Sequence, residues 1–132
     1  MRTSELALTP SDWAIMIFKD NVIASGELEA NASGKSYQVS FEAAPAVYDD
    51  PSQATKTGDA LLVEVLRKDG SVLKSFEHAP GAWSGKSEFA TTQFSYQGDG
   101  SGDIRLRIGA AGNKTNDRFI GAIDNLILKE TK

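Results

Sequence analysis

The sequence contains no cysteine and only one histidine, His78. A chain without thiols has no disulfide framework, no thiolate zinc site and no cysteine nucleophile. A nucleophilic triad usually needs a histidine as its base, so His78 is the one histidine available for such chemistry. It ends a predicted strand close to Pro80, and we interpret it as a surface residue. These absences favour a protein that is not an enzyme.

Long hydrophobic runs and a positive net charge are missing as well. The longest apolar stretch near the start, WAIMIF at 13–18, is far shorter than the roughly 20 residues of a membrane-spanning helix. The net charge of −4 argues against sequence-independent nucleic-acid binding, which needs a basic face to neutralise phosphates. Residues 1–5 lack the basic start and long apolar run of a signal peptide, which leaves the compartment open. We expect neither a membrane nor nucleic acid as a partner.

Short alternating runs separated by Gly, Asp, Asn and Pro make up most of the chain, which is typical of an all-β sandwich or barrel. We predict one domain over residues 1–132, an antiparallel β-sandwich of the jelly-roll type with about eight strands. Tight hairpins are expected at Asp20-Asn21 and at Lys68-Asp69-Gly70. The expected strands cover residues 13–19, 22–29, 35–46, 61–67, 71–78, 88–96, 104–108 and 118–129.

Acidic residues provide few catalytic candidates. Glu27 and Glu29 lie two residues apart, as paired carboxylates on one face of a strand would, but solvated surface charge explains them more simply. In the segment GDGSGD at 98–103, Asp99 and Asp103 have oxygen ligands suited to calcium. The EF-hand spacing is absent, so we expect a flexible turn there.

Ligand-binding candidates come from loops and from one strand. Tyr37, Phe41 and Phe94 alternate with polar residues and are expected in the core. Trp83 and Tyr48 fall in predicted loops, where exposed aromatic rings could stack on sugar rings, although Trp83 could equally close one end of the sandwich. Arg105 and Arg107 share one strand face and either pair with carboxylates or bind an acidic sugar or phosphate. Asn113, in a polar loop, completes the predicted set.

The order of these segments is similar to that of a known family. A YQVSFEA strand, an LLVEVLRKDGSVL hairpin, a GAW loop, GDGSGDIRLRIG and a closing GAIDNLIL together resemble galactose-binding-like jelly-roll modules of bacterial carbohydrate-binding proteins. The resemblance covers residues 35–129. It implies a non-catalytic module that binds carbohydrate, is commonly extracellular and often holds a structural calcium ion. Residues 1–30 lack the family's usual opening strand, which often contributes calcium ligands.

The resemblance maps one calcium ligand to Asp124 in the closing strand. Independently of the family, an acid inside an apolar strand needs a partner, and accepting a hydrogen bond from a neighbouring backbone N–H is the alternative. The sequence also allows a second function, that of a protein-interaction domain. The run 13–18 is apolar on both faces, so it must be buried in the core or in a homodimer formed through the N-terminal strands. A sandwich-type lyase or hydrolase is a third possibility.

Overall fold

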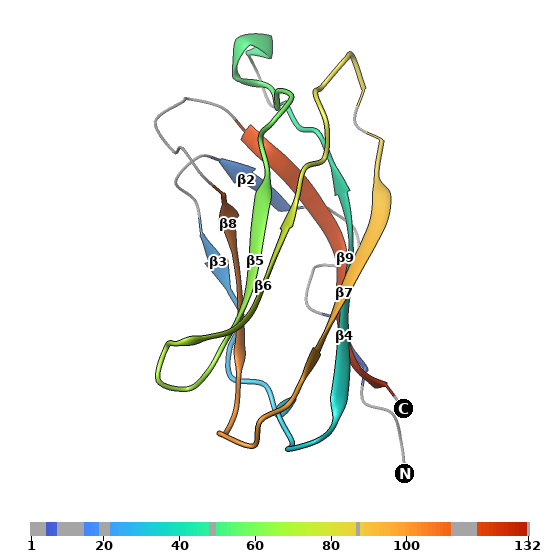
Figure 1. The fold of residues 1–132 in the computed structure, drawn as a ribbon. Helices are drawn as coiled ribbons and strands as arrows, with labels where there is room; N and C mark the ends of the chain where they lie inside the picture. The colour runs from blue at the N-terminus through green and yellow to red at the C-terminus, as the bar shows by residue number, and fades with distance from the viewer. Residues whose placement is uncertain are drawn as a thin grey trace.

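The computed structural model describes residues 5–7, 15–18, 22–47, 50–86, 88–111 and 119–131. These residues form two antiparallel sheets packed face to face, which confirms the predicted β-sandwich (Figure 1). One sheet has the order β1-β9-β4-β7, with β2 also paired to β9, and the other has the order β3-β8-β5-β6. The strands are β1 (Glu5–Ala7), β2 (Ile15–Phe18), β3 (Ile23–Ala24), β4 (Ser36–Ala44), β5 (Leu61–Leu66), β6 (Val72–His78), β7 (Ala90–Gln97), β8 (Arg105–Ala110) and β9 (Phe119–Thr131).

Period-two alternation places the core between the sheets. In β4, Tyr37, Val39 and Phe41 are buried, while the residues between them are partly exposed, as the sequence pattern predicted. The same alternation in β5 and β8 buries Val63 and Leu106 against them. β4 ends at Ala44, directly before Pro45, because proline has no N–H to donate to the ladder. The one helix among the described residues is the 3-10 turn Pro51–Gln53, and none is long and apolar enough to cross a bilayer.

Of the two predicted hairpins, one is confirmed and the other is wrong. β5 and β6 pair through the Lys68-Asp69-Gly70 turn, where Gly70 adopts a φ of 90°. In contrast, β2 pairs with β9 in one sheet and β3 pairs with β8 in the other. The two strands that flank Asp20-Asn21 therefore do not pair with each other, and the dipeptide itself lies outside the described residues. That dipeptide lacks the glycine that would favour a two-residue turn.

The closing strand β9 is the longest strand and the centre of its sheet. It pairs with β4 on one side and with β1 and β2 on the other. The register against β4 shifts between Ser40 and Glu42, where Asn125 adopts a left-handed φ of 50°. Such a shift marks a β-bulge, which inserts an extra residue into one strand of a pair. The bulge lies directly after Asp124.

A buried asparagine holds the loop 98–103, which was expected to be flexible. Asn31 is only 6% exposed, and the two hydrogens of its amide are shared among three acceptors, Asp99 Oδ1 at 2.8 Å, Ser101 Oγ at 3.0 Å and the Gly102 carbonyl at 2.9 Å. Its Oδ1 accepts from the Asp99 N–H. The expectation of a free turn is therefore corrected, because this one side chain satisfies several polar groups of the loop.

Candidate ligand-binding face

The outer face of the β3-β8-β5-β6 sheet contains a shallow hollow of about 310 Å³, which we call the Arg107 hollow. Leu62 and Glu64 reach it from β5 because they alternate with the buried Leu61 and Val63. Arg107 and Gly109 come from β8 by the same alternation, and Gly109 lies opposite Leu62 in the register. A glycine at this position adds no side chain to fill the hollow. Its lining is Val22, Leu62, Glu64, Arg107, Gly109 and Ala110.

A preformed ion pair lies in the Arg107 hollow. Arg107 and Glu64 are directly opposite in the register, and Arg107 donates from both Nε, at 2.9 Å, and Nη2, at 2.7 Å. Both bonds end on Glu64 Oε1, so within the described part of the chain Oε2 accepts no hydrogen bond. The Glu64 side chain is 14% exposed and that of Arg107 is 43% exposed. The pair thus presents both donors and an acceptor to solvent.

Arg105 and Val22 extend this face on either side of the ion pair. Arg105 is exposed and points to the same side as Arg107, two residues away along β8. It makes no hydrogen bond or ion pair to any residue that the structure describes. Val22 is 51% exposed, unusual for a valine, and supplies an apolar wall. The face therefore combines cationic donors, one carboxylate acceptor and apolar surface.

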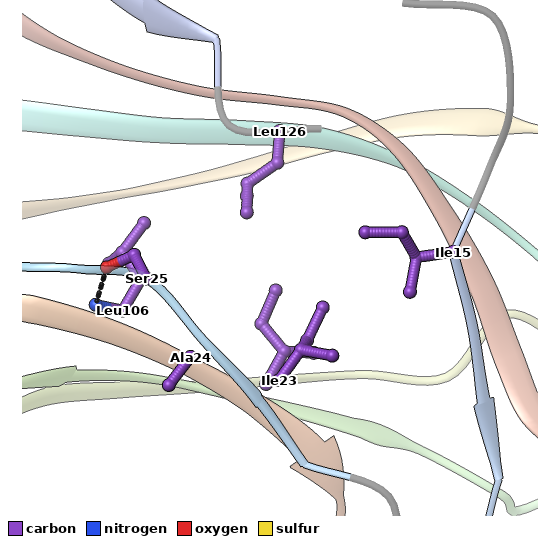
Figure 2. A pocket seen from close by; sticks show the side chains of 7 residues that line it. Ile15, Ile23, Ala24, Ser25, Leu106 and Leu126 are labelled. Carbon is purple, nitrogen blue, oxygen red and sulfur yellow. Dashed lines mark hydrogen bonds between the residues drawn. The ribbon is translucent and has the colours of Figure 1, made fainter. Parts of the chain in front are cut away.

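A second cavity lies between the two sheets and has a different chemistry (Figure 2). This inter-sheet crevice has a volume of about 120 Å³ and is lined by Ile15, Ile23, Ala24, Ser25, Leu106, Ile108 and Leu126. Among the described lining residues, the one polar side chain is that of Ser25, whose Oγ accepts from the Leu106 N–H and donates to the Gly26 carbonyl. The described lining therefore provides little to hydrogen-bond a hydroxyl-rich ligand.

The structure separates the other predicted ligand-binding residues from the arginines or leaves them undescribed. Tyr48 and Asn113 lie outside the described residues. Trp83 is partly buried in the loop 79–89, where its backbone N–H donates to the Thr55 carbonyl at 2.9 Å. Its backbone is therefore tied to another loop, as it would be for a residue that closes one end of the sandwich. Of the three predicted ligand-binding residues that the structure describes, Arg105 and Arg107 lie together and Trp83 lies apart from them.

Asp124 is on β9, in the sheet that does not contain the arginines. Its Oδ1 accepts from the Asn125 N–H at 2.8 Å, which matches the capping alternative. Glu42 lies opposite Asp124 in the register, but its Oε2 accepts a hydrogen bond from the Asn125 amide. Calcium takes six to eight oxygen ligands, and within the described ranges no cluster of three or more acidic or histidine side chains forms. The described donors around Asp124 do not fit a calcium site.

The titratable candidates for catalysis are scattered. Glu27 and Glu29 are both exposed and lie outside the strands. His78 is half-buried at the end of β6, with its ring edge-on to Phe41 at a centroid distance of 6.1 Å. Burial alone lowers the pKa of His78, so its imidazole is more readily neutral. This environment is that of a packing residue, and a more buried one than the sequence suggested.

Glu64, Leu62 and Val22 were not among the predicted site residues. Glu64 alternates with apolar residues in β5 and so resembled an ordinary solvated strand charge. Its partner Arg107 is 43 residues away along the chain, and only the β5–β8 register joins them. The signal available in sequence is the pair of arginines, for which carboxylates on a neighbouring strand are one of the two expected kinds of partner. Arg107 meets such a carboxylate.

No family model and no curated protein matches the chain. Among solved structures it is similar to the carbohydrate-binding module TmCBM61 in complex with β-1,4-galactotriose. That match has a TM-score of 0.53 and 16% identity, and it covers 96% of this chain and 80% of the module. The likeness is one of fold. It confirms, at the level of the fold, the resemblance to carbohydrate-binding jelly-roll modules that the sequence suggested.

Other matches show that the same fold serves different purposes. The VP2 subviral particle protein of infectious bursal disease virus matches with a TM-score of 0.56 and 9% identity, over 98% of this chain and 32% of the viral chain. A cyclase from Fischerella sp. TAU matches with a TM-score of 0.51 and 11% identity, over 98% of this chain and 74% of the cyclase. Fold alone therefore does not choose between binding, assembly and catalysis.

Proposed function

We propose that the protein is a non-catalytic carbohydrate-binding module that holds its ligand on the Arg107 hollow. The observation that carries the proposal is the Arg107–Glu64 ion pair, which is partly exposed beside the apolar side chains of Leu62 and Val22. Sugars present hydroxyl groups at their edges and C–H groups on their faces. A site with convergent polar groups on an apolar wall provides both kinds of contact.

The roles of the individual residues follow from their remaining hydrogen-bonding capacity. Glu64 Oε2, to which no described residue donates, accepts from a ligand hydroxyl, while Arg107 and Arg105 donate to ring or hydroxyl oxygens. Leu62 and Val22 pack against a C–H face, and Gly109 leaves room for the ring. Two guanidinium groups on one face also favour a ligand that carries a carboxylate, such as a uronic acid, since arginine binds planar oxyanions in a bidentate manner.

The inter-sheet crevice is less suited to this ligand because its described lining is mostly apolar and the Ser25 hydroxyl is already bonded. Support for carbohydrate over other polar ligands comes from the fold: a protein of the same fold, TmCBM61, was solved with β-1,4-galactotriose. We carry that ligand class to this chain as a proposal.

The test is a titration against a panel of neutral and uronic-acid oligosaccharides, including β-1,4-galactotriose, followed by calorimetry. We expect Arg107→Gln and Glu64→Gln each to weaken binding by about tenfold or more, as loss of a charge-assisted hydrogen bond should. Lys74→Gln, an exposed lysine on β6, is the matched control and should bind like the parent chain. Thermal melting of each variant confirms that it is folded.

Two further arms separate the alternatives. Trp83→Ala should leave binding unchanged, and loss of binding there with retention in Arg107→Gln would move the site to the loop end. A titration with calcium and then with EDTA tests whether carbohydrate binding requires calcium, as the family resemblance implies. The described residues around Asp124 provide too few oxygen donors for a calcium site. Failure to bind any member of the panel would overturn the proposal.

An assembly role is the second candidate function. It is favoured by the free edge of the sheet at β7, and the VP2 subviral particle protein is among the chains of similar fold.

A further inference from the structure

Strand β7 has one free edge. It pairs with β4 from Ala90 to Gln97 in an unbroken antiparallel register. No other described strand pairs with its second side, so that β7 lies at the outside of its sheet (Figure 1). An edge strand presents a row of unpaired N–H and C=O groups, which is a template for another strand. We call this row the β7 edge.

The β7 edge lacks the features by which proteins usually protect such strands. Charged side chains, proline, bulges and very short strands all discourage edge-to-edge pairing. The sequence ATTQFSYQ contains no charged residue, no proline and no glycine, and its register against β4 has no bulge. Its outward side chains Thr91, Gln93 and Ser95 are exposed. Nothing in the strand opposes pairing.

The other described edges are protected. β6 carries Lys74, Glu77 and His78, and its register against β5 is irregular. β3 has two residues. β1 and β2, which share one side of β9, have three and four residues, and β2 ends in a register shift. Among the described edge strands, β7 is therefore the one without these protective features.

We propose that the β7 edge pairs antiparallel with the β7 edge of a second copy of this chain, joining two sandwiches through one continuous sheet. A strand without charges can meet itself without like-charge repulsion. The two-fold pairing places Thr, Gln and Ser side chains opposite one another, where they can hydrogen-bond across the interface. A two-fold dimer is also the commonest symmetric assembly.

An exposed apolar side chain lies at one end of this edge, because Phe89, directly before β7, is 39% exposed. At the other end, Leu73 and Lys74 of β6 line a groove with Gln97, so the start of β6 lies beside the end of β7. An antiparallel two-fold therefore brings Phe89 of one copy to the Leu73 end of the other. This contact would remove Phe89 from water in each copy.

The interface is independent of the proposed carbohydrate site, because Arg107 lies on the outer face of the other sheet. Each copy keeps its Arg107 hollow, and failure of one proposal leaves the other standing.

Sedimentation equilibrium over a concentration series is the first test. We expect a reversible dimer, and we expect Gln93→Lys to raise its dissociation constant about tenfold or more, because two lysines then meet across the two-fold axis. Thr57→Lys adds the same charge at an exposed position away from the edge and should leave the constant unchanged. A chain that stays monomeric up to its solubility limit would overturn the proposal.

Single cysteines give a second, positional readout, since the natural chain has none. A disulfide forms only between Cα atoms closer than about 7 Å, as in directly paired strands. Under mild oxidation at least one of Thr91→Cys, Gln93→Cys and Ser95→Cys should cross-link into a dimer much faster than Thr57→Cys. Met16→Cys tests the edge at β2, where Met16 is 37% exposed. Fast cross-linking there and none in β7 would instead place the interface at the N-terminal strands.

Discussion

The two ends of the sandwich are fixed by buried polar side chains of different kinds. At one end, Asn31 makes four side-chain hydrogen bonds, all of them to the loop 98–103. At the other end, Thr55 is 2% exposed, and its hydroxyl accepts from the Ala46 N–H at 2.8 Å and donates to the Phe119 carbonyl at 2.9 Å. The Thr55 carbonyl also accepts from the Trp83 N–H. Thr55 thus joins three separate segments.

The two ends differ in how the hydrogen bonds of the buried side chain are distributed over the neighbouring segments. Asn31 concentrates its bonds on one loop and draws in a charge, because Asp99 also accepts from Arg67 Nε at 2.8 Å. Thr55 uses one neutral hydroxyl to connect segments that are far apart in sequence. We therefore expect damage at the Asn31 end to be larger and pH-dependent, and damage at the Thr55 end to be smaller and spread over several loops.

Gly98→Ala should have the largest effect on stability. A Cβ at this position would lie 2.2 Å from the Ala32 carbonyl oxygen, so backbone must move to admit it. We expect a loss of about 3 kcal/mol or more in the free energy of unfolding, measured by urea denaturation. Gly26→Ala is the control, because a Cβ there meets nothing within 4 Å. Equal losses in the two variants would show that the close contact between residue 98 and the Ala32 carbonyl does not affect stability.

Asn31→Ala should follow, with a loss of about 2–3 kcal/mol, since it leaves buried polar groups of the loop without partners. Hydrogen exchange should rise at the backbone amides of Asp99 and Ser101 and remain unchanged at Ala46. If hydrogen exchange rises equally at both ends, the two ends of the sandwich are not stabilised independently.

Thr55→Val should cost about 1–2 kcal/mol, because it keeps the shape of the side chain and removes the hydroxyl. Thr55→Ser retains the hydroxyl and is the matched control. The amide of Ala46 should lose protection against exchange in Thr55→Val only. If Thr55→Ser is as unstable as Thr55→Val, packing of the methyl group and not the hydrogen bonds would hold this end.

The strands and one hairpin were predictable because their signals are local. Alternation of Tyr37, Val39 and Phe41 fixes which face of β4 is buried, and the Asp-Gly turn fixes the β5–β6 pairing. At Asp20-Asn21 the local signal was misleading, because β2 gains its partner from the far end of the chain, in β9. Local sequence patterns do not indicate which distant segment a strand will pair with.

The candidate site was only partly predictable for the same reason. The two arginines on one strand face could be read from their spacing in β8. Glu64 joins them only through the β5–β8 register, 43 residues away from Arg107. Asn31 lies 68 residues away from Asp99, and no feature of its own neighbourhood marks it as buried. Contacts of this length follow from topology and are invisible to patterns of sequence.

The smallest expected effect is a difference between the two ends in how their contribution to stability depends on pH. Hydrogen bonds from Ser101, followed by those from Arg67 and Asn31, hold the pKa of Asp99 well below its usual 3.8. The folded chain therefore binds fewer protons here than the unfolded chain, so the stability that Asp99 contributes is complete above about pH 4 and is lost as the pH falls below it. Asp99→Asn should flatten the decline of the urea midpoint between about pH 5 and pH 2.

Asp50, in the loop at the Thr55 end, also has a lowered pKa, because it accepts from the Ser52 N–H. Since no arginine among the described residues pairs with Asp50, Asp50→Asn should flatten the decline less. An equal change in both variants would show that the charge at the Asn31 end adds nothing specific to it.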